Sequence, residues 1–316
     1  MSFLPVAREK NMIQATTGAL LSRRAMLALG TGAALAALTA NAGTAHASAS
    51  GEGEVSLRLA ELEREHDARV GVFGHHVRTG RTVRYRAGET FPMCSVFKTL
   101  AAAAVLRDLD RDGEFLAKRL RYTRQDVDES GWAPETGKHI ADGMTVAELC
   151  DAALTRSDNA AANLLLRELG GPAAVTRFCR SVGDRTTRLD RWEPELNSAE
   201  PWRVEDTTTP YAIGRTYARL VLGNALSPRD RRQLTAWLRA NTTSDHRFRE
   251  GLPAGWTLGD KTGTGDYGTA NDVGIAWAPD GSPVVLAVLT TKHTQEAKAD
   301  DALIADVARL LATSLG

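Results

Sequence analysis

The chain has 316 residues, of which 43% are hydrophobic and 25% are charged. This is an ordinary globular composition, and it provides enough apolar material for one large domain or two interleaved subdomains. Lys and Arg balance Asp and Glu at 39 each, so charge gives no reason to expect nucleic acid or an anionic membrane as a partner.

The first 47 residues are typical of an export signal. The pair Arg23 and Arg24 precedes a mildly apolar run over residues 28–40 and a small-residue cleavage pattern over residues 45–47. We therefore expect residues 1–47 to be a cleaved twin-arginine signal peptide, recognised by the twin-arginine export machinery. A transmembrane anchor is the alternative, but Gly and Thr dilute the run. Cleavage removes four basic residues and one acidic residue, which leaves a formal net charge of minus 3.

The next elements are a leader, a helix and two strands. Residues 48–54 are small and polar, which predicts a disordered leader. Val55, Leu59 and Leu62 then recur at helical spacing and indicate one apolar stripe on a charged helix. Residues 70–77 and 82–85 read as two strands joined by a turn.

A run of strong helix formers follows from Ser95, and it predicts a buried, Ala-rich helix. Positions i and i+3 share a helix face, so Ser95 and Lys98 can touch. A serine hydroxyl becomes a good nucleophile when a neighbouring base takes its proton, and an amine does this only when its pKa is lowered. The motif alone is weak, because Ser-x-x-Lys arises by chance about once in a chain of this size.

The region from residue 95 to about residue 222 is mostly helical, with two notable polar segments. Ser157-Asp158-Asn159 interrupts a helical pattern, and these residue types are also good helix N-caps. Glu193 and Asn197 lie four residues apart in a Pro-interrupted loop, where a carboxylate and an amide can share one water. A charged surface loop is the alternative for this second segment.

Strands return near the C-terminus, over residues 256–262, 272–277 and 284–291, followed by a helix over 299–311. We therefore predict an α+β fold in which N- and C-terminal segments form one antiparallel sheet flanked by helices. The expected catalytic domain covers residues 55–316, with an α/β part over about 55–93 and 240–316. The helical part covers about 94–239, and the active site lies in the seam.

Three short motifs occur once each in a fixed order: Ser-x-x-Lys at Ser95, Ser-Asp-Asn at Ser157 and Lys-Thr-Gly at Lys261. The Glu-x-x-x-Asn loop lies between the second and the third. This set resembles the class A serine β-lactamases, and the likeness covers residues 55–316. The resemblance implies hydrolysis of penicillins and cephalosporins through a serine acyl-enzyme, which confers antibiotic resistance and needs no metal or cofactor.

The resemblance also implies the role of each site residue. Ser95 is the nucleophile, Lys98 activates it, Ser157 delivers a proton to the lactam nitrogen, and Glu193 is the base for the deacylating water. Whether Lys98 or Glu193 takes the first proton is disputed for the family and stays open. The backbone N–H groups of Ser95 and Thr264 match the oxyanion hole. The implied substrate-binding residues are Asn159, Asn197, Lys261, Thr262, Gly263, Thr264, Arg247 and Trp132.

Other positions support these or depart from the family pattern. Arg249 competes with Arg247 for the role of the arginine that binds the substrate carboxylate. Arg191 and Asp206 match a pair that bridges the neck of the Glu193 loop. Cys150 matches half of a family disulfide, but Ala102 stands at the partner position. Cys94 is interpreted as a packing residue, and the position that pairs with it in carbapenem-hydrolysing members is Gly265. The missing pair argues against broad carbapenem turnover, but the sequence leaves the substrate spectrum open.

A related enzyme, a sensor of another functional class and a metal-dependent enzyme compete with this interpretation. A D-alanyl-D-alanine peptidase shares the three short motifs but lacks the deacylating loop. A penicillin-recognising sensor stays acylated and is usually tethered to a membrane. A metal-dependent lactamase is disfavoured, because the seven histidines show no His-x-His or His-Glu-x-x-His spacing. Nothing in the sequence requires more than a monomer.

Overall fold

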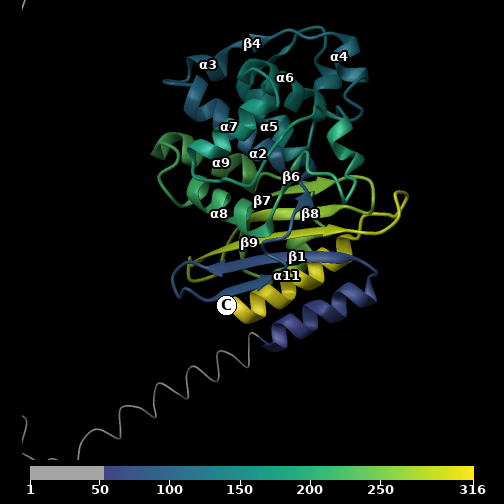
Figure 1. Cartoon of the computed structure of the whole chain (residues 1–316). Coiled ribbons are helices and arrows are strands. Elements are labelled where there is room, and N and C mark those ends of the chain that lie inside the picture. The colour runs from purple at the N-terminus through teal and green to yellow at the C-terminus, as the bar shows by residue number, and fades with distance from the viewer. Residues whose placement is uncertain (1–52) are drawn as a thin grey trace, which may run out of the picture. The chain divides into compact units, whose positions relative to one another are not determined.

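The computed structural model describes residues 53–316 and is built around a five-stranded antiparallel sheet (Figure 1). The strand order β2-β1-β9-β8-β7 brings the N-terminal hairpin beside the last strand. Val72 pairs with Val288, and Thr262 pairs with Asp272. The predicted α+β class and the joint sheet are confirmed. The strands are β1 (Arg69–His76), β2 (Thr82–Tyr85), β7 (Thr257–Thr264), β8 (Ala270–Trp277) and β9 (Pro283–Thr291).

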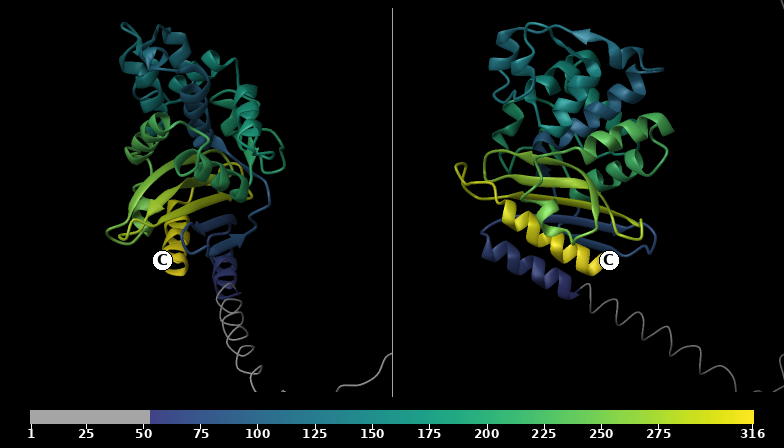
Figure 2. Two further views of the ribbon diagram at one scale, coloured as in Figure 1. Left: turned by 90° about the vertical axis from the view of Figure 1, so that its left-hand side faces the viewer. Right: turned by 180° about the vertical axis from the view of Figure 1, so that it is seen from behind.

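One face of the sheet is covered by the two terminal helices (Figure 2). The first covers residues 53–65, and the second is α11 (Asp301–Leu315). Leu59 and Leu62 are fully buried against the sheet, which confirms the predicted stripe. The helix already includes residues 53 and 54, which we had expected in the disordered leader; both are exposed, and Val55 in the same first turn packs against the core. The rest of the leader and the signal segment lie outside the described residues.

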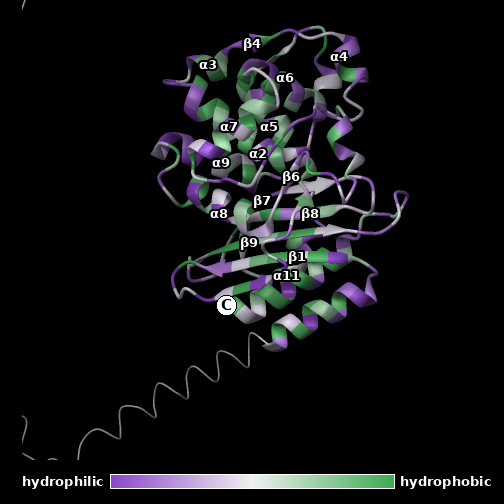
Figure 3. Cartoon of the chain, viewed as in Figure 1, coloured by the Kyte–Doolittle hydropathy of each residue, from purple (hydrophilic) through white to green (hydrophobic). Residues whose placement is uncertain are grey.

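The opposite face carries α8 (Pro210–Val221) and α9 (Pro228–Arg239). Each helix begins with a proline after a Thr or Ser cap, a good start because the first helical N–H needs no intrahelical partner. Tyr217 of α8 is fully buried between the sheet and the helical region. Hydrophobic residues accordingly concentrate on β9 and in the helices around α2 (Phe97–Ala104) and α5 (Val146–Thr155) (Figure 3).

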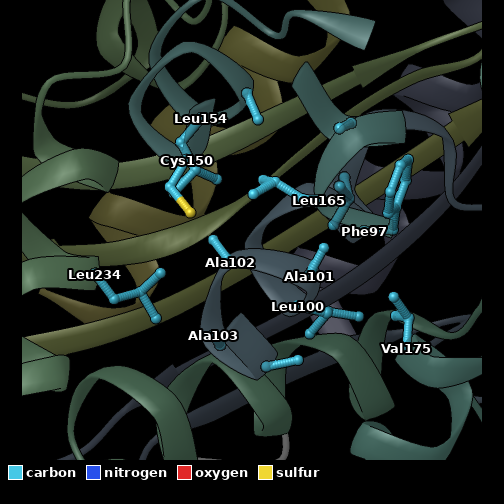
Figure 4. Close-up of a cluster of buried hydrophobic side chains, with 14 of the residues drawn as sticks. Phe97, Leu100, Ala101, Ala102, Ala103, Cys150, Leu154, Leu165, Val175 and Leu234 are labelled. Carbon is cyan, nitrogen blue, oxygen red and sulfur yellow. The ribbon is translucent and has the colours of Figure 1, made fainter. Parts of the chain in front are cut away.

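The helix that follows Ser95 forms the centre of the helical region. It begins as a 3-10 turn (Cys94–Val96), continues as α2 and ends in a π-helical turn (Val105–Leu109). Every residue of α2 is buried, as predicted, and its alanines let neighbouring helices approach closely. Cys150 and Ala102 lie in this same core (Figure 4). The neighbouring helices are α5, α6 (Asn159–Leu169) and α7 (Ala173–Ser181).

Short elements complete the framework. The two-residue pairs β3 (Phe91–Pro92) with β6 (Thr207–Thr208) and β4 (Arg119–Leu120) with β5 (Met144–Thr145) join distant segments. The remaining helices are α3 (Glu114–Ala117), α4 (Arg124–Asp128), α10 (Phe248–Gly251) and the 3-10 turns η3 (Thr136–Lys138) and η4 (Glu195–Ser198). Within residues 53–316, no helix is long and apolar enough to cross a membrane.

Candidate active site

Ser95 lies where the sheet meets the helical region. Its 3-10 turn follows Met93 directly and contacts β7. Gly263 of β7 makes this approach possible, since a Cβ on it would lie 2.9 Å from Met93 O and 3.3 Å from the Cβ of Cys94. The close approach brings Thr264, the next residue of β7, toward the turn that carries Ser95.

Lys98 lies one turn further along and is completely buried. Its Nζ donates hydrogen bonds to Ser157 O (2.8 Å) and Asn159 Oδ1 (2.6 Å), and it lies 3.0 Å from Glu193 Oε1. Burial lowers the pKa of Lys98, and the Glu193 carboxylate opposes this shift. The amine is therefore held between the Ser157 segment and the Glu193 loop, and Glu193 is its one ion-pair partner among the described residues.

Glu193 joins the nucleophile to the loop that follows it. Ser95 Oγ donates to Glu193 Oε1 at 3.3 Å, while Asn197 Nδ2 donates to Glu193 Oε2. Within residues 53–316 the other amide atom, Asn197 Oδ1, is buried and has no hydrogen-bond partner. A buried acceptor of this kind needs a donor, and a water at the carboxylate would supply one.

Ser95 and Lys98 share a partner and are not hydrogen-bonded to each other in the described part of the chain. Ser95 Oγ and Lys98 Nζ both meet Glu193 Oε1 instead. Two causes are visible. Ser95 lies in a 3-10 turn and not in the α-helix, and Lys98 Nζ is drawn to the acceptors at Ser157 and Asn159.

The loop around Glu193 is fixed at several points. Asn163 of α6 donates its side-chain amide to Glu193 O (2.8 Å) and accepts from Glu193 N (3.1 Å). At the neck, Arg191 Nε donates to Asp206 Oδ2 at 2.5 Å. On the other edge, Asp266 N donates to Asn197 O at 2.9 Å. The base is thus held by its backbone as well as by its carboxylate.

Ser157 lies between two buried lysines. Its Oγ is 3.4 Å from Lys98 Nζ and 3.1 Å from Lys261 Nζ. Its backbone is left-handed, with φ of 55°, which is uncommon for a residue other than glycine. Asp158 caps α6 by accepting from Ala161 N, so the helix-cap interpretation holds for the middle residue of this motif.

Lys261 reaches the site from β7. It is completely buried, and its Nζ donates to Thr262 O at 2.9 Å. Burial, together with the nearby positive charge of Lys98, lowers the pKa of Lys261 to about 7. No carboxylate lies within ion-pair distance of this amine in residues 53–316. An anionic group entering the site would therefore meet a positive charge that the protein leaves without an ion-pair partner.

Arg247 reaches the same strand from behind. Its guanidinium donates to Thr264 Oγ1 (2.8 Å), to Gly263 O (2.9 Å) and to Asn271 O (2.8 Å). The competing Arg249 donates instead to Asn241 O at 3.0 Å and reaches no residue of the Lys-Thr-Gly motif. Arg247 is thus the arginine that contacts the Lys-Thr-Gly-Thr strand.

The comparisons with known proteins agree with this geometry. A model described as the β-lactamase enzyme family matches residues 54–315. A β-lactamase of Streptomyces lavendulae is 65% identical over 303 residues, covering 95% of this chain and 99% of the relative. The chain belongs to the β-lactamase enzyme family.

Solved structures of β-lactamases place the chain more narrowly. The β-lactamase from Streptomyces albus G is 66% identical with a TM-score of 0.82, covering 83% of this chain and all of that one. An ancestral class A β-lactamase is 54% identical with a TM-score of 0.78, covering 82% of this chain and 99% of that one. The chain is therefore a class A β-lactamase, as its motif order predicts.

In this β-lactamase Trp132 and Asn159 are joined through the backbone, because Asn159 N donates to Trp132 O at 2.8 Å. Trp132 is 58% exposed, and its Nε1 donates to Arg156 O at 3.2 Å. Asn159 is tied at both ends of its amide, because Oδ1 accepts from Lys98 and Nδ2 donates to Ser130 O at 3.0 Å. The Thr262 hydroxyl lies 2.5 Å from that of Thr243.

Three supporting residues were not singled out from the sequence. Asn163 holds the backbone of Glu193, Thr243 contacts Thr262, and Asp301 accepts from Arg247 Nε at 2.7 Å. Asn163 falls at i+4 from Asn159, which places the two amides on one face of α6. This spacing was a usable signal. Thr243 and Asp301 carry none, because they meet their partners only through the fold.

The cysteines of this β-lactamase are all reduced and buried. Burial raises the pKa of the Cys94 thiol, which agrees with a packing role and not with a second nucleophile. A Cβ on Gly265 would lie 2.8 Å from Cys94 Sγ, so the two positions do face each other. Residues 53–316 contain no cluster of three side chains suited to a metal ion.

Proposed function

We propose that this β-lactamase opens the lactam ring of penicillins, and of cephalosporins, through an ester on Ser95 that Glu193 hydrolyses. In the first step Ser95 Oγ bonds to the lactam carbonyl carbon, and the carbon–nitrogen bond breaks. Either Glu193 or Lys98 takes the Ser95 proton, since Ser95 Oγ and Lys98 Nζ both contact Glu193 Oε1. Ser157 passes a proton to the ring nitrogen, and Lys98 and Lys261 flank its hydroxyl.

In the second step a water attacks the ester carbonyl and Glu193 takes its proton. Ser95 Oγ then leaves as the carbon–oxygen bond breaks, and it takes up the proton that Glu193 removed from the water. Asn197 holds this water, and its unpartnered Oδ1 among the described residues supports that role. Lys261, Thr262, Thr264 and Arg247 bind the substrate carboxylate, while the backbone N–H groups of Ser95 and Thr264 stabilise the oxyanion.

The observation that carries the proposal is the shared contact at Glu193. One carboxylate touches the nucleophile through Oε1 and the water-holding Asn197 through Oε2. A peptidase with the same three short motifs lacks the loop that carries Glu193 and Asn197, and a sensor stays acylated. Turnover, and not lasting acylation, is therefore the expected outcome.

The test mixes residues 48–316 with a large excess of a chromogenic cephalosporin. Ring opening is followed by absorbance, and the protein is followed by intact mass. Many turnovers per protein with little lasting adduct support the proposal, whereas one equivalent of ring opening followed by a stable adduct contradicts it. Ser95→Ala is the control, and covalent labelling of that variant by penicillin would overturn the assignment of the nucleophile.

We also propose that the enzyme is exported by the twin-arginine route and acts as a monomer in the periplasm or outside the cell. The support is the pattern over residues 1–47, which lie outside the described structure. Replacing Arg23 and Arg24 by lysine should retain the precursor inside the cell, as immunoblots of cell fractions would report. Export of that variant at the parent level would contradict the route. Light scattering of the mature protein tests its oligomeric state.

A further inference from the structure

Two fully buried carboxylic acids lie behind the Lys-Thr-Gly strand, outside the chemistry proposed above. Asp260 belongs to β7 and Asp272 to β8. Asp272 pairs with Thr262, two residues beyond Asp260, so the two acids lie diagonally on one face of the paired strands. Both side chains are completely inaccessible to solvent.

Each of the two acids has one carboxylate oxygen that accepts a hydrogen bond from the described residues and one that does not. Asp260 Oδ2 accepts from Asn241 Nδ2 at 2.8 Å, and Asp272 Oδ2 accepts from Phe248 N at 3.2 Å. Asp260 Oδ1 and Asp272 Oδ1 are buried without a hydrogen-bond partner among the described residues. Two ionised carboxylates would leave both of these acceptors unpaired and would repel each other. A single proton between the two oxygens satisfies both.

We propose that Asp272 is protonated, that it donates this proton to Asp260, and that the resulting acid pair positions Arg247. Asp260 is the ionised member, because it accepts from Asn241 and lies nearest a cation. The effect of burial on the two acids agrees with this assignment. It raises the pKa of both, and the charge of Asp260 raises the pKa of Asp272 further.

The surrounding charges do not remove the need for the proton. Arg249 Nη2 is 3.7 Å from Asp260 Oδ1, which is beyond a hydrogen bond, and this nitrogen already donates to Asn241 O. Arg247 donates to Asp301 and to the neighbouring strands. The other titratable groups that face the pair are Lys261 on β7 and Tyr217 on α8. Neither of them donates a hydrogen bond to Asp260 Oδ1 or Asp272 Oδ1.

The link to substrate binding runs through the segment 241–248. Asn241 and Phe248 stand at its two ends, and each is held by one member of the pair. Arg247 immediately precedes Phe248 and extends to Thr264 Oγ1. The acid pair therefore clamps both ends of the segment whose arginine is proposed to meet the substrate carboxylate.

Asp272→Asn and Asp272→Leu test the proposal from two sides. The amide that Asp272→Asn introduces reproduces the shape and the donor of the protonated acid, so this variant should keep kcat and KM for a penicillin within about twofold. The Asp272→Leu change removes both hydrogen bonds, so KM should rise about tenfold with kcat changed much less. Asp245→Asn is the matched control, because it lies in the same segment with an exposed carboxylate. An unchanged KM in a folded Asp272→Leu protein would overturn the positioning role.

Two readouts do not depend on the proposed activity. The infrared spectrum should contain a band of a protonated carboxylic acid above neutral pH, and Asp272→Asn should lack it. Because the folded state holds a proton that the unfolded state releases, the Tm of the parent should fall relative to that of Asp272→Asn as the pH rises above about 4, where the unfolded acid ionises. Absence of the band, or Tm values that stay parallel over this range, would show that the pair holds no proton. The infrared and Tm measurements test the acid pair even if the protein does not hydrolyse the penicillin used for the kinetics.

Discussion

Two fully buried lysines flank Ser157, and they differ in what balances their charge. Lys98 lies 3.0 Å from Glu193 Oε1, whereas Lys261 has only hydroxyl and carbonyl oxygens as partners among the described residues. Burial lowers the pKa of both amines, but only Lys98 recovers part of that loss from a carboxylate at ion-pair distance. The same residue type therefore serves proton transfer on one side of Ser157 and attraction of an anion on the other.

Removing the carboxylate of Glu193 tests the Lys98 side and should give the largest effect. Glu193→Gln keeps the shape of the side chain but cannot take a proton from water. A general base contributes about a hundredfold to ten-thousandfold, so deacylation should slow by that range and the acyl-enzyme should accumulate. Intact mass after mixing with penicillin measures the adduct. Glu195→Gln, two residues along the same loop, is the control, and parent-rate turnover by Glu193→Gln would exclude Glu193 as the deacylation base.

Removing the charge of Lys261 tests the other side of Ser157. Hydrogen bonds to charged groups contribute about 1.5 to 3 kcal/mol, so kcat/KM for an anionic penicillin should fall roughly tenfold to a hundredfold in Lys261→Ala. Lys261→Arg keeps the charge and should lose less. Steady-state kinetics on a penicillin and on its uncharged methyl ester measure this difference. An equal fall in kcat/KM on both substrates would show that Lys261 does not interact with the substrate carboxylate.

The pH dependence separates the two lysines without removing either. Since the pKa of Lys261 is lowered to about 7, its positive charge is present below that pH and is lost as the pH rises. In the free enzyme, kcat/KM for an anionic penicillin should therefore decline above about pH 7. Lys261→Arg stays charged, so the decline should move to higher pH. A profile unchanged in the arginine variant would assign the decline to Lys98 instead.

Sequence reasoning was most successful where a pattern is local. The strand hairpin, the Ala-rich helix after Ser95 and the apolar stripe of Leu59 and Leu62 were confirmed because each follows from periodicity and turn chemistry. Contacts across the fold had no such signal. The unpaired oxygens of Asp260 and Asp272 depend on the register of two strands, which no spacing in the sequence encodes.

The site shows the same division between local pattern and long-range contact. The motif order pointed to Ser95, Lys98 and Glu193, but Ser-x-x-Lys spacing suggested direct contact between the first two. In the structure Ser95 and Lys98 each contact the carboxylate of Glu193, which lies far beyond Lys98 in sequence. Sequence spacing favours Lys98 as the partner of Ser95, because it is only three residues away. The distant Glu193 becomes the partner only once its loop is packed against the site.

The smallest expected effect concerns the elements that hold the surroundings of the two lysines in place. Lys98 depends on a loop whose neck is closed by Arg191 and Asp206, whereas Lys261 stands on β7, which pairs along its whole length with β8. In Arg191→Ala, Asp206 Oδ1 still accepts from the backbone N–H groups of residues 190 and 191, so the fold should persist with Tm lowered by a few degrees.

The looser neck in Arg191→Ala should let Glu193 move away from its water. Deacylation should then slow severalfold, while acylation of Ser95 changes less, and rapid-quench measurement of the two steps reports the difference. Arg188→Ala is the matched control, because Arg188 pairs with Asp190 at the same neck but is 41% exposed and a surface ion pair contributes about 1 kcal/mol or less. If both steps slow equally in Arg191→Ala, the neck supports the whole site and the two lysines share one scaffold.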